Sequence, residues 1–262
     1  MKRFLFASTA IVAAAASFAQ ASPTINGAHV NPRWWNDMSG STLTVVNTYP
    51  SPAHINFNEV LPGSPVFQSN QHTWRLSTDG GTTDAPFANG DSFMISAAVT
   101  ITGDGNAEAG LNVSPWWSPQ VDGKLHVRAS ATGGEVAAFG GRLPFYSFGN
   151  VYVTGTTATL SIEYIANSNT AGAPGQIQYG YNGLFSPWIQ FDQGNPAEDP
   201  PHGLYGTLSP AWVGGFVQDY ASASGATTVN ADFNNIVYNP VPAPGTAGLL
   251  GLGGLLAARR RR

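Results

Sequence analysis

The sequence predicts an all-β protein, and the most economical architecture is a two-sheet antiparallel jelly-roll sandwich. Asp, Glu, Lys and Arg make up only 10% of the 262 residues, too few for the wet faces of long surface helices. The chain has 31 Gly and 19 Pro, which interrupt its apolar runs at short intervals, and no run shows a clear helical period. The apolar fraction of 42% excludes a disordered chain, and the absence of Cys excludes a disulfide scaffold.

Strand-like runs separated by Gly, Pro, Asn and Asp predict about a dozen strands. They lie in one domain, residues 22–238, which is long enough for a single sandwich with an ample core. The expected strands are 42–49, 54–60, 92–102, 109–113, 124–129, 135–139, 151–153, 157–165, 176–181, 188–191, 212–220 and 227–238.

Some of these runs alternate apolar and polar residues, as expected when one face of a strand is buried and the other is wet. The alternating apolar sets are Leu125, Val127 and Ala129 in one run and Leu160, Ile162 and Tyr164 in another. In the last run, Phe233, Ile236 and Val237 break the alternation, which indicates a bulge or a strand covered on both faces.

The first residues have the three parts of a secretory signal peptide. Met1-Lys2-Arg3 is a basic start, residues 4–18 are apolar and rich in Ala, and Ala19-Gln20-Ala21 is a small-x-small cleavage site. We therefore expect residues 1–21 to be removed and the mature chain to begin at Ser22. A short buried helix is the alternative, but the segment shows no amphipathic period.

The last residues, 239–262, form a second targeting segment. A Pro-rich motif, Val241-Pro242-Ala243-Pro244-Gly245-Thr246, precedes residues 247–258, which are Ala, Gly and Leu alone, and Arg259 to Arg262 end the chain. Counted from Val241, the apolar stretch is just long enough to span a bilayer, near the lower limit of about 17 residues. By the positive-inside rule, the arginines would stay in the cytoplasm and leave the preceding domain on the other side of the membrane.

This segment resembles the PEP-CTERM sorting signal of Gram-negative bacteria, a Val-Pro-Glu-Pro-Gly-Thr motif followed by a hydrophobic helix and an Arg cluster. Ala243 stands in the place of the Glu. The resemblance implies transient anchoring in the inner membrane, cleavage by an exosortase-type membrane protease, and a link to extracellular polysaccharide. A plain membrane tail without processing is the alternative. The matching residues are Val241, Pro242, Pro244, Gly245, Thr246, Arg259, Arg260, Arg261 and Arg262.

Removal of both ends makes the chain more acidic than its full-length net charge of −4. Six of the 11 basic residues lie in the terminal segments, whereas all 15 acidic residues lie between them, which leaves five basic residues and a net charge of −10. Five scattered cations do not make the clustered basic face that a phosphate backbone requires, so no nucleic-acid partner is expected.

The strand succession between Asp91 and Tyr238 resembles that of concanavalin A-like jelly rolls. Segments 121–128, 159–164 and 231–238 carry this resemblance. In addition, Phe233-Asn234-Asn235-Ile236 is similar to the Phe-Asp-Asn-Ile/Val strand on which laminin-G-like domains often close. The resemblance implies the fold and carries no catalytic signature.

The sequence contains no recognisable catalytic motif. Glucanases of this fold carry carboxylates as Glu-x-Asp-x-x-Glu on one strand, because retaining cleavage needs two carboxyl groups about 5–5.5 Å apart. This chain has no such triplet, no Cys, no Gly-x-Ser-x-Gly elbow and no His pair at zinc-site spacing. We therefore expect a protein that is not an enzyme. The alternative is a glycan-active hydrolase or lyase with carboxylates gathered from separate strands.

Calcium is the cofactor that the sequence suggests, although the predicted fold does not require one. Asp104, Asn106 and Glu108 place oxygen ligands at alternate positions in a Gly-containing loop, and a second acidic loop contains Asp79, Asp84 and Asp91. Asp and Asn are also the ordinary residues of turns, so a solvent-exposed turn is the alternative.

Aromatic side chains suggest a surface on which sugar rings stack. We single out the adjacent pair Trp116 and Trp117, together with Tyr179, Tyr181 and Trp188. In a strand, one ring of the Trp pair is expected to point outward, and the two tyrosines share a face. Core packing is the alternative for each ring.

These observations together predict an exported, non-catalytic β-sandwich of the bacterial cell surface or extracellular matrix, with a structural or carbohydrate-binding role. Its expected partners are the exosortase-type protease and extracellular polysaccharide.

Overall fold

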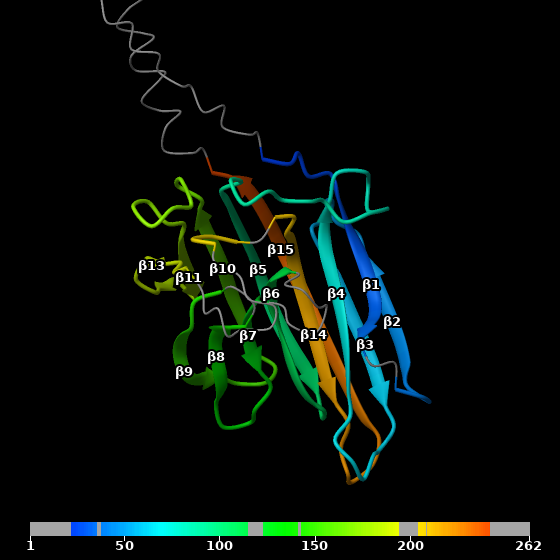
Figure 1. Ribbon diagram of the computed structural model, residues 1–262. Coiled ribbons are helices and arrows are strands. Elements are labelled where there is room, and N and C mark those ends of the chain that lie inside the picture. The colour runs from blue at the N-terminus through cyan, green and yellow to red at the C-terminus, as the bar shows by residue number, and fades with distance from the viewer. Residues whose placement is uncertain are drawn as a thin grey trace, which may run out of the picture.

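The computed structural model describes residues 22–35, 38–114, 123–140, 143–193, 204–207 and 209–241. Within these ranges the regular elements are all β-strands, and they form two stacked antiparallel sheets (Figure 1). The predicted all-β jelly-roll sandwich is therefore confirmed.

The seven-stranded sheet, sheet A, and the eight-stranded sheet, sheet B, enclose the core between them. From edge to edge, sheet A consists of β1 (Gly27–Trp35), β4 (Ser69–Ser77), β14 (Trp212–Tyr220), β6 (Asn106–Ser114), β7 (Gly123–Arg128), β8 (Gly134–Phe139) and β9 (Tyr146–Tyr152). Sheet B consists of β12 (Leu184–Phe185), β11 (Gln176–Tyr181), β10 (Thr157–Ile165), β5 (Phe93–Gly103), β15 (Thr227–Pro240), β3 (Ile55–Leu61) and β2 (Thr42–Asn47), with β13 (Ile189–Gln190) paired to β11.

The last strand contains the predicted bulge. The register of β15 against β5 shifts between Asn234 and Val237, and Asn235 adopts a positive φ of 50°. Because the bulge resets the alternation, Phe233 and Ile236 are both buried although they are three residues apart.

Strands β1 and β4 were not expected from the sequence. Every residue of β4 is buried, yet most of them are polar, so the strand has no apolar alternation to reveal it. Its polar side chains have partners on both faces: Asn70 and His72 contact Glu59 in the core, and Arg75 pairs with Asp84 on the other face. Tertiary pairing therefore overrides the weak local strand signal.

The polar face of β7 is exposed only at Arg128, at the end of the strand, whereas the whole face was predicted to be wet. Leu125 and Val127 face the core as expected, but Lys124 and His126, which point away from it, are also buried. The buried polar groups on this outer face therefore require partners of their own.

Both described chain ends lie at the same end of the sandwich. Ser22 Oγ and the Val241 N–H both donate hydrogen bonds to the Ser92 carbonyl oxygen, at 3.2 and 3.0 Å. Ser92 precedes β5, an 11-residue strand that spans roughly 35 Å. The turn that follows β5 therefore lies at the opposite end (Figure 1).

Candidate functional site

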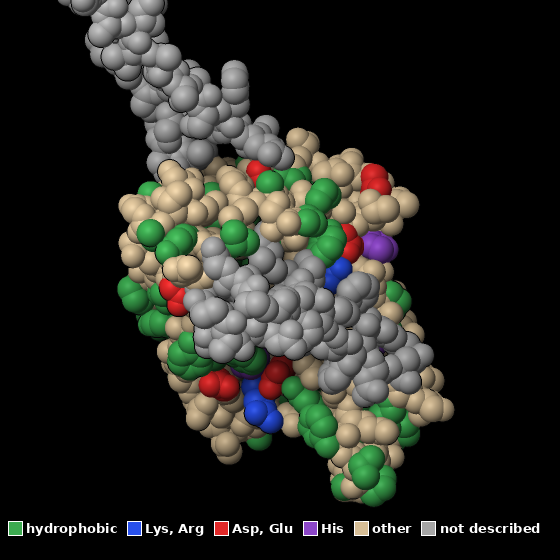
Figure 2. Space-filling model, in the orientation of Figure 1, with side chains coloured by type: hydrophobic (Ala, Val, Ile, Leu, Met, Phe, Trp, Pro, Cys, Tyr) green, Lys and Arg blue, Asp and Glu red, His purple; other side chains and the backbone are tan. Residues whose placement is uncertain are grey.

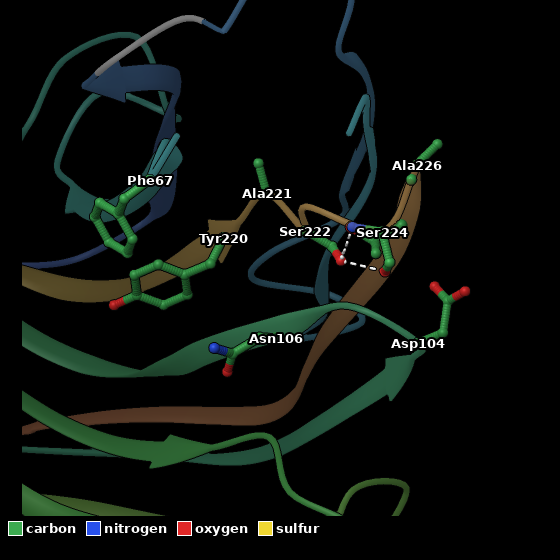
Figure 3. Close-up of a pocket in the computed structure, with 10 residues that line it drawn as sticks. Phe67, Asp104, Asn106, Tyr220, Ala221, Ser222, Ser224 and Ala226 are labelled. Atoms are coloured by element: carbon green, nitrogen blue, oxygen red, sulfur yellow. Dashed lines mark hydrogen bonds between the residues drawn. The ribbon is translucent and has the colours of Figure 1, made fainter. Parts of the chain in front are cut away.

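A pocket opens at the end of the sandwich that lies away from the chain ends (Figure 3). Its volume is about 430 Å³. The β5–β6 turn, the β14–β15 turn and the loop between β3 and β4 meet there, and we call it the end pocket. The polar and aromatic residues that line it are Phe67, Asp104, Asn106, Tyr220, Ser222, Ser224 and Thr227.

Two glycines fix the β5–β6 turn on either side of Asp104. Gly103 has a φ of +106°, and a Cβ at this residue would lie 2.1 Å from the Thr228 carbonyl oxygen. A Cβ on Gly105 would lie 2.4 Å from a methyl group of Val229. The turn therefore packs closely on β15, and Asp104 is held there because its carboxylate accepts a hydrogen bond of 2.7 Å from the Thr228 N–H.

Backbone hydrogen bonds tie the loops around the end pocket to one another. The Ser64 N–H donates to the Ser222 carbonyl, and the Ala221 N–H donates to the Gln68 carbonyl, each at 2.9 Å. Within the β14–β15 turn, the hydroxyls of Ser222 and Ser224 are hydrogen-bonded at 2.6 Å. A pocket that is fixed before a ligand arrives loses less conformational entropy on binding.

Two aromatic rings lie at one side of the end pocket. Phe67 is 77% exposed, and its ring centroid lies 5.5 Å from that of Tyr220 with 44° between the ring planes. Asn106 and Asp104 add an amide and a carboxylate to the same pocket (Figure 3). The end pocket thus combines apolar ring surface with hydrogen-bonding groups, the usual composition of a small-ligand site.

The outer face of sheet A, turned away from sheet B, carries a band of polar side chains. Lys124 Nζ donates to Gln71 Oε1 at 2.9 Å and to Gln218 Oε1 at 3.0 Å. The three Lys and Arg side chains that the structure describes, Arg75, Lys124 and Arg128, all belong to this face. Figure 2 shows basic and acidic side chains next to one another here, so the cations do not form an unopposed basic surface.

His126 lies among charged residues of this band. Its Nδ1 is 3.5 Å from a Glu108 oxygen and its Nε2 is 3.8 Å from a Glu135 oxygen, distances too long for well-formed hydrogen bonds. Arg128 Nε lies 3.9 Å from Glu108. The imidazole is 1% exposed and packs edge-on against Phe139. We call Glu108, His126, Arg128 and Glu135 the His126 cluster.

The surroundings of the His126 cluster shift two pKa values. Burial raises the pKa of Glu108, but contact with His126, the charges of His126 and Lys124, and the Tyr220 hydroxyl together outweigh it, so this pKa lies below its ordinary value. Burial and the Glu108 carboxylate, to which the Tyr220 hydroxyl donates, raise the pKa of Tyr220. Glu108 is therefore ionised and Tyr220 protonated at neutral pH.

The lowered pKa of Glu108 predicts a pH-dependent contribution to stability. Ionised Glu108 stabilises the fold above its unfolded-state pKa of about 4.3, and this contribution is lost as the pH falls through the lower folded-state pKa. In urea denaturation, the stability lost in Glu108→Gln should be largest above about pH 5 and should shrink below about pH 4. Glu163→Gln, on sheet B, is the control. A Glu108→Gln deficit that stays constant with pH would contradict the prediction.

The aromatic residues singled out from the sequence lie in different environments. Tyr179 and Tyr181 are buried in the core, where their hydroxyls donate to the carbonyls of Pro144 and Val151. Their shared face is the core face of sheet B, so they do not form the exposed ring surface that we expected. Trp188 is 40% exposed and stays a candidate. Trp116 and Trp117 lie outside the described residues.

The predicted calcium ligands have separate partners. Asp104 is bonded to β15, Asn106 lines the end pocket and Glu108 belongs to the His126 cluster. In the second acidic loop, the Asp79 carboxylate accepts hydrogen bonds from the N–H groups of Thr82 and Thr83, and that of Asp91 accepts one from the Ala88 N–H. Asp84 pairs with His29 and Arg75. The second loop therefore uses its carboxylates in its own structure, and a calcium site at Asp104, Asn106 and Glu108 remains a prediction.

Most of the targeting segments lie outside the described residues. Val241 is described, and its N–H bonds to Ser92 as given above. Residues 1–21 and the remainder of the sorting motif, Pro242, Pro244, Gly245, Thr246 and Arg259 to Arg262, are not described. Across the ranges given for the fold, the chain forms no helix that combines the length and the apolar character needed to cross a bilayer.

Sequence reasoning missed both rings of the end pocket. Tyr220 is the last residue of an expected strand, where it attracted no functional interpretation. Phe67 follows Pro62-Gly63-Ser64-Pro65-Val66, and this turn-rich context was the available signal, since a large apolar residue in such a loop has no strand face through which to reach the core.

No family model and no curated protein sequence matches the chain. Among solved structures, it is similar to the alginate lyase AlgAT5 of polysaccharide lyase family 7, with 11% identity, a TM-score of 0.47, and coverage of 83% of this chain and 95% of the lyase. It is also similar to the carbohydrate-binding module CBM66 from Bacillus subtilis (13% identity, TM-score 0.40, 78% and 98% covered) and to lectin II from Ulex europaeus (11%, 0.35, 82% and 100%). At these identities and scores, the similarities assign the chain to no family.

Proposed function

We propose that the end pocket binds a carbohydrate and that the protein is a non-catalytic glycan-binding component of the bacterial cell surface or extracellular matrix. The observation that carries the proposal is the exposed Phe67 ring, packed against Tyr220 beside Asn106 and Asp104. One face of a sugar ring is lined with C–H groups and packs well on an aromatic ring, whereas its hydroxyls need donors and acceptors close by. The end pocket provides both.

The position of the end pocket is consistent with attachment of the protein to a membrane through its C-terminal segment. The Pro-rich sorting motif begins at Val241, and the end pocket lies at the far end of the sandwich from that residue. A membrane-held form would therefore present the pocket away from the bilayer. The exported location, the exosortase-type protease and the transient membrane contact belong to this proposal and rest on the sequence.

A glycan array tests the binding site. The purified protein should bind at least one polysaccharide or oligosaccharide on the array, and Phe67→Ala should weaken that binding by about tenfold or more, because a ring contact of this kind contributes on the order of 1.4 kcal/mol. Phe145→Ala is the matched control, since Phe145 is similarly exposed at 68% but does not line the end pocket. Equal binding by Phe67→Ala and the wild type would rule out the end pocket.

A glycan-active enzyme is the second candidate, and the His126 cluster is the observation that favours it. Among the described residues, neither ring nitrogen of His126 makes a well-formed hydrogen bond, although carboxylates lie 3.5 and 3.8 Å away on the two sides of the ring. An imidazole with carboxylates on both sides is a residue pattern used in general acid–base catalysis. The glycans that bind on the array should therefore be incubated with the wild type and with His126→Gln. Cleavage by the wild type that His126→Gln lacks would establish catalysis in place of binding alone.

Mass spectrometry of protein recovered from outside the cells tests the export and sorting part of the proposal. We expect a chain that begins near Ser22 and lacks Arg259 to Arg262. An exported chain with an intact C-terminus would show that the tail is not processed.

A further inference from the structure

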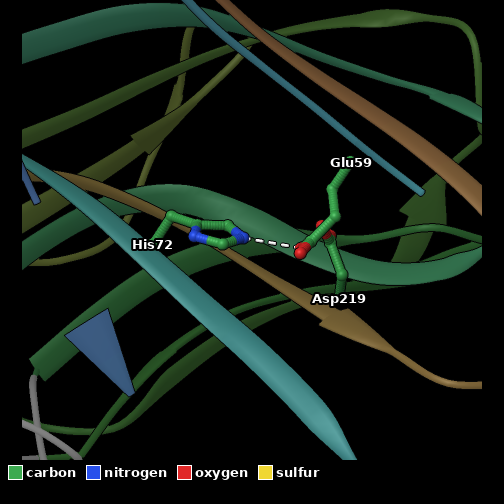
Figure 4. A group of neighbouring side chains, drawn as sticks. All are labelled: Glu59, His72 and Asp219. Carbon is green, nitrogen blue, oxygen red and sulfur yellow. Dashed lines mark hydrogen bonds and ion pairs between the residues drawn. The ribbon is translucent and has the colours of Figure 1, made fainter. Parts of the chain in front are cut away.

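Three ionisable side chains meet inside the apolar core between the two sheets. Glu59 comes from β3 of sheet B, and His72 and Asp219 come from β4 and β14 of sheet A. Glu59 and His72 are 0% exposed and Asp219 is 1% exposed. Figure 4 shows the three side chains turned toward one another. They link the two sheets, and neither the end pocket nor the His126 cluster includes them.

The surrounding residues hold this group in place. His72 Nε2 lies 2.6 Å from one Glu59 oxygen, and Asn70 Nδ2 donates to the other, also at 2.6 Å. The Met38 N–H in turn donates to Asn70 Oδ1 at 2.8 Å. The His72 ring stacks on Phe57 with 15° between the planes. The positions of Glu59 and His72 are therefore fixed by contacts on several sides.

Asp219 lacks comparable support. Among the residues that the structure describes, no N–H group donates to either of its carboxylate oxygens, and the buried side chain meets the Glu59 carboxylate. A buried carboxylate without a donor is costly, and a second carboxylate beside it adds repulsion. The arrangement requires a cation between the two acids, either a proton or a metal ion.

We propose that Glu59, His72 and Asp219 form a structural binding site for a divalent transition-metal ion of the Zn²⁺ or Mn²⁺ type. One ligand atom from each of the three residues lies within 4.8 Å of the other two. One imidazole nitrogen and two carboxylates are a donor set that such ions bind, whereas Ca²⁺ takes six to eight oxygen ligands. Two ionised carboxylates and a neutral imidazole also balance the double positive charge, which leaves no net charge in the core.

Metal binding would change the local geometry in a defined way. Zinc lies about 2.0–2.2 Å from nitrogen and oxygen ligands, so two ligand atoms around it are separated by more than about 3 Å. His72 Nε2 and Glu59 Oε2, now 2.6 Å apart, would therefore move apart by several tenths of an ångström. In return the ion would balance the charges of Asp219 and Glu59, and β3 would be joined to β4 and β14 across the sandwich.

Metal uptake by the purified full chain, free of any affinity tag that binds metal, tests the site. The protein is treated with a chelator, dialysed, loaded separately with Zn²⁺, Mn²⁺ or Ca²⁺, and passed through a desalting column before elemental analysis. We expect about one Zn²⁺ or Mn²⁺ per chain bound at this site, together with a melting temperature several degrees above that of the stripped protein. Any Ca²⁺ that is retained should belong to the separate loop at Asp104, Asn106 and Glu108, and Asp219→Asn should not change it. Co²⁺ in the same site should give visible absorption bands from imidazole and carboxylate coordination.

Variants separate this site from adventitious binding. Asp219→Asn should weaken Zn²⁺ and Co²⁺ binding by at least the roughly 10- to 100-fold that the loss of a supporting residue costs. Asp232→Asn is the control, because Asp232 pairs with His54 at 2.6 Å on the surface of sheet B and should leave metal uptake unchanged. If Asp219→Asn does not fold, the stoichiometry and the Co²⁺ spectrum of the wild type decide whether the metal binds at this site. No uptake by the wild type, or uptake unaffected by Asp219→Asn in folded protein, would overturn the proposal and leave a proton as the bound cation.

Discussion

Replacement of Trp74 by alanine should lower the free energy of unfolding by about 3–5 kcal/mol, the cost of removing a large buried aromatic side chain. Trp74 lies on β4 and is fully buried, and its ring meets Phe233 of β15 edge-on at 5.7 Å. The pair therefore joins sheet A to sheet B at the centre of the core. Gly215, on the neighbouring strand β14 of sheet A, makes room for the indole, because a Cβ at this residue would lie 2.5 Å from Trp74 Nε1.

Urea denaturation of Trp74→Ala beside Trp188→Ala measures this effect. Trp188 is partly exposed, so its truncation should cost less than about 1 kcal/mol. Similar losses in the two variants would mean that the two sheets are not held together by packing around Trp74.

Gly110→Ala should destabilise the protein by about 3 kcal/mol, the upper end of the cost of overpacking. A Cβ on Gly110 would lie 2.0 Å from the Leu125 carbonyl oxygen of the neighbouring strand β7. Backbone cannot give way as a flexible side chain does, so β6 and β7 would have to separate. Gly110 pairs with His126 in this ladder, so the same change should also disturb the His126 cluster.

The control for this substitution is Gly172→Ala, because nothing lies within 4 Å of a Cβ at that residue. It should be neutral, or slightly stabilising because alanine restricts the unfolded chain. Thermal melts of the two variants make the comparison. An undisturbed melting temperature in Gly110→Ala would show that β6 and β7 are spaced more widely than described.

Apolar runs in the sequence predicted most of the strands, including β6, which is buried on both faces. The ranges 157–165, 176–181 and 212–220 match β10, β11 and β14 residue for residue. Strand β4 was missed because polar pairs, and not apolar alternation, hold its residues in the interior. Polar pairing also explains why most of the outer face of β7, which was expected to be wet, is buried. A single sequence does not show which polar residues meet across two sheets.

The candidate sites were also difficult to predict, because their residues come from distant parts of the chain. The sequence identified Asp104 and Asn106 as candidate calcium ligands, and the structure places both in the end pocket beside Phe67 and Tyr220. Tyr179 and Tyr181, singled out separately as rings that stack on sugars, are buried in the core. Those pocket residues come from three segments that are brought together by long-range pairing. Likewise Glu59, His72 and Asp219 are separated by up to 160 positions in the chain, and no local motif marks them.

The most direct test of the carbohydrate-binding proposal is a crystal structure of the protein with the tightest glycan from the array. We predict a sugar ring stacked on Phe67, with its hydroxyls hydrogen-bonded to Asn106 or Asp104. A sugar bound instead beside Trp188 or at the His126 cluster, with the end pocket empty, would contradict it.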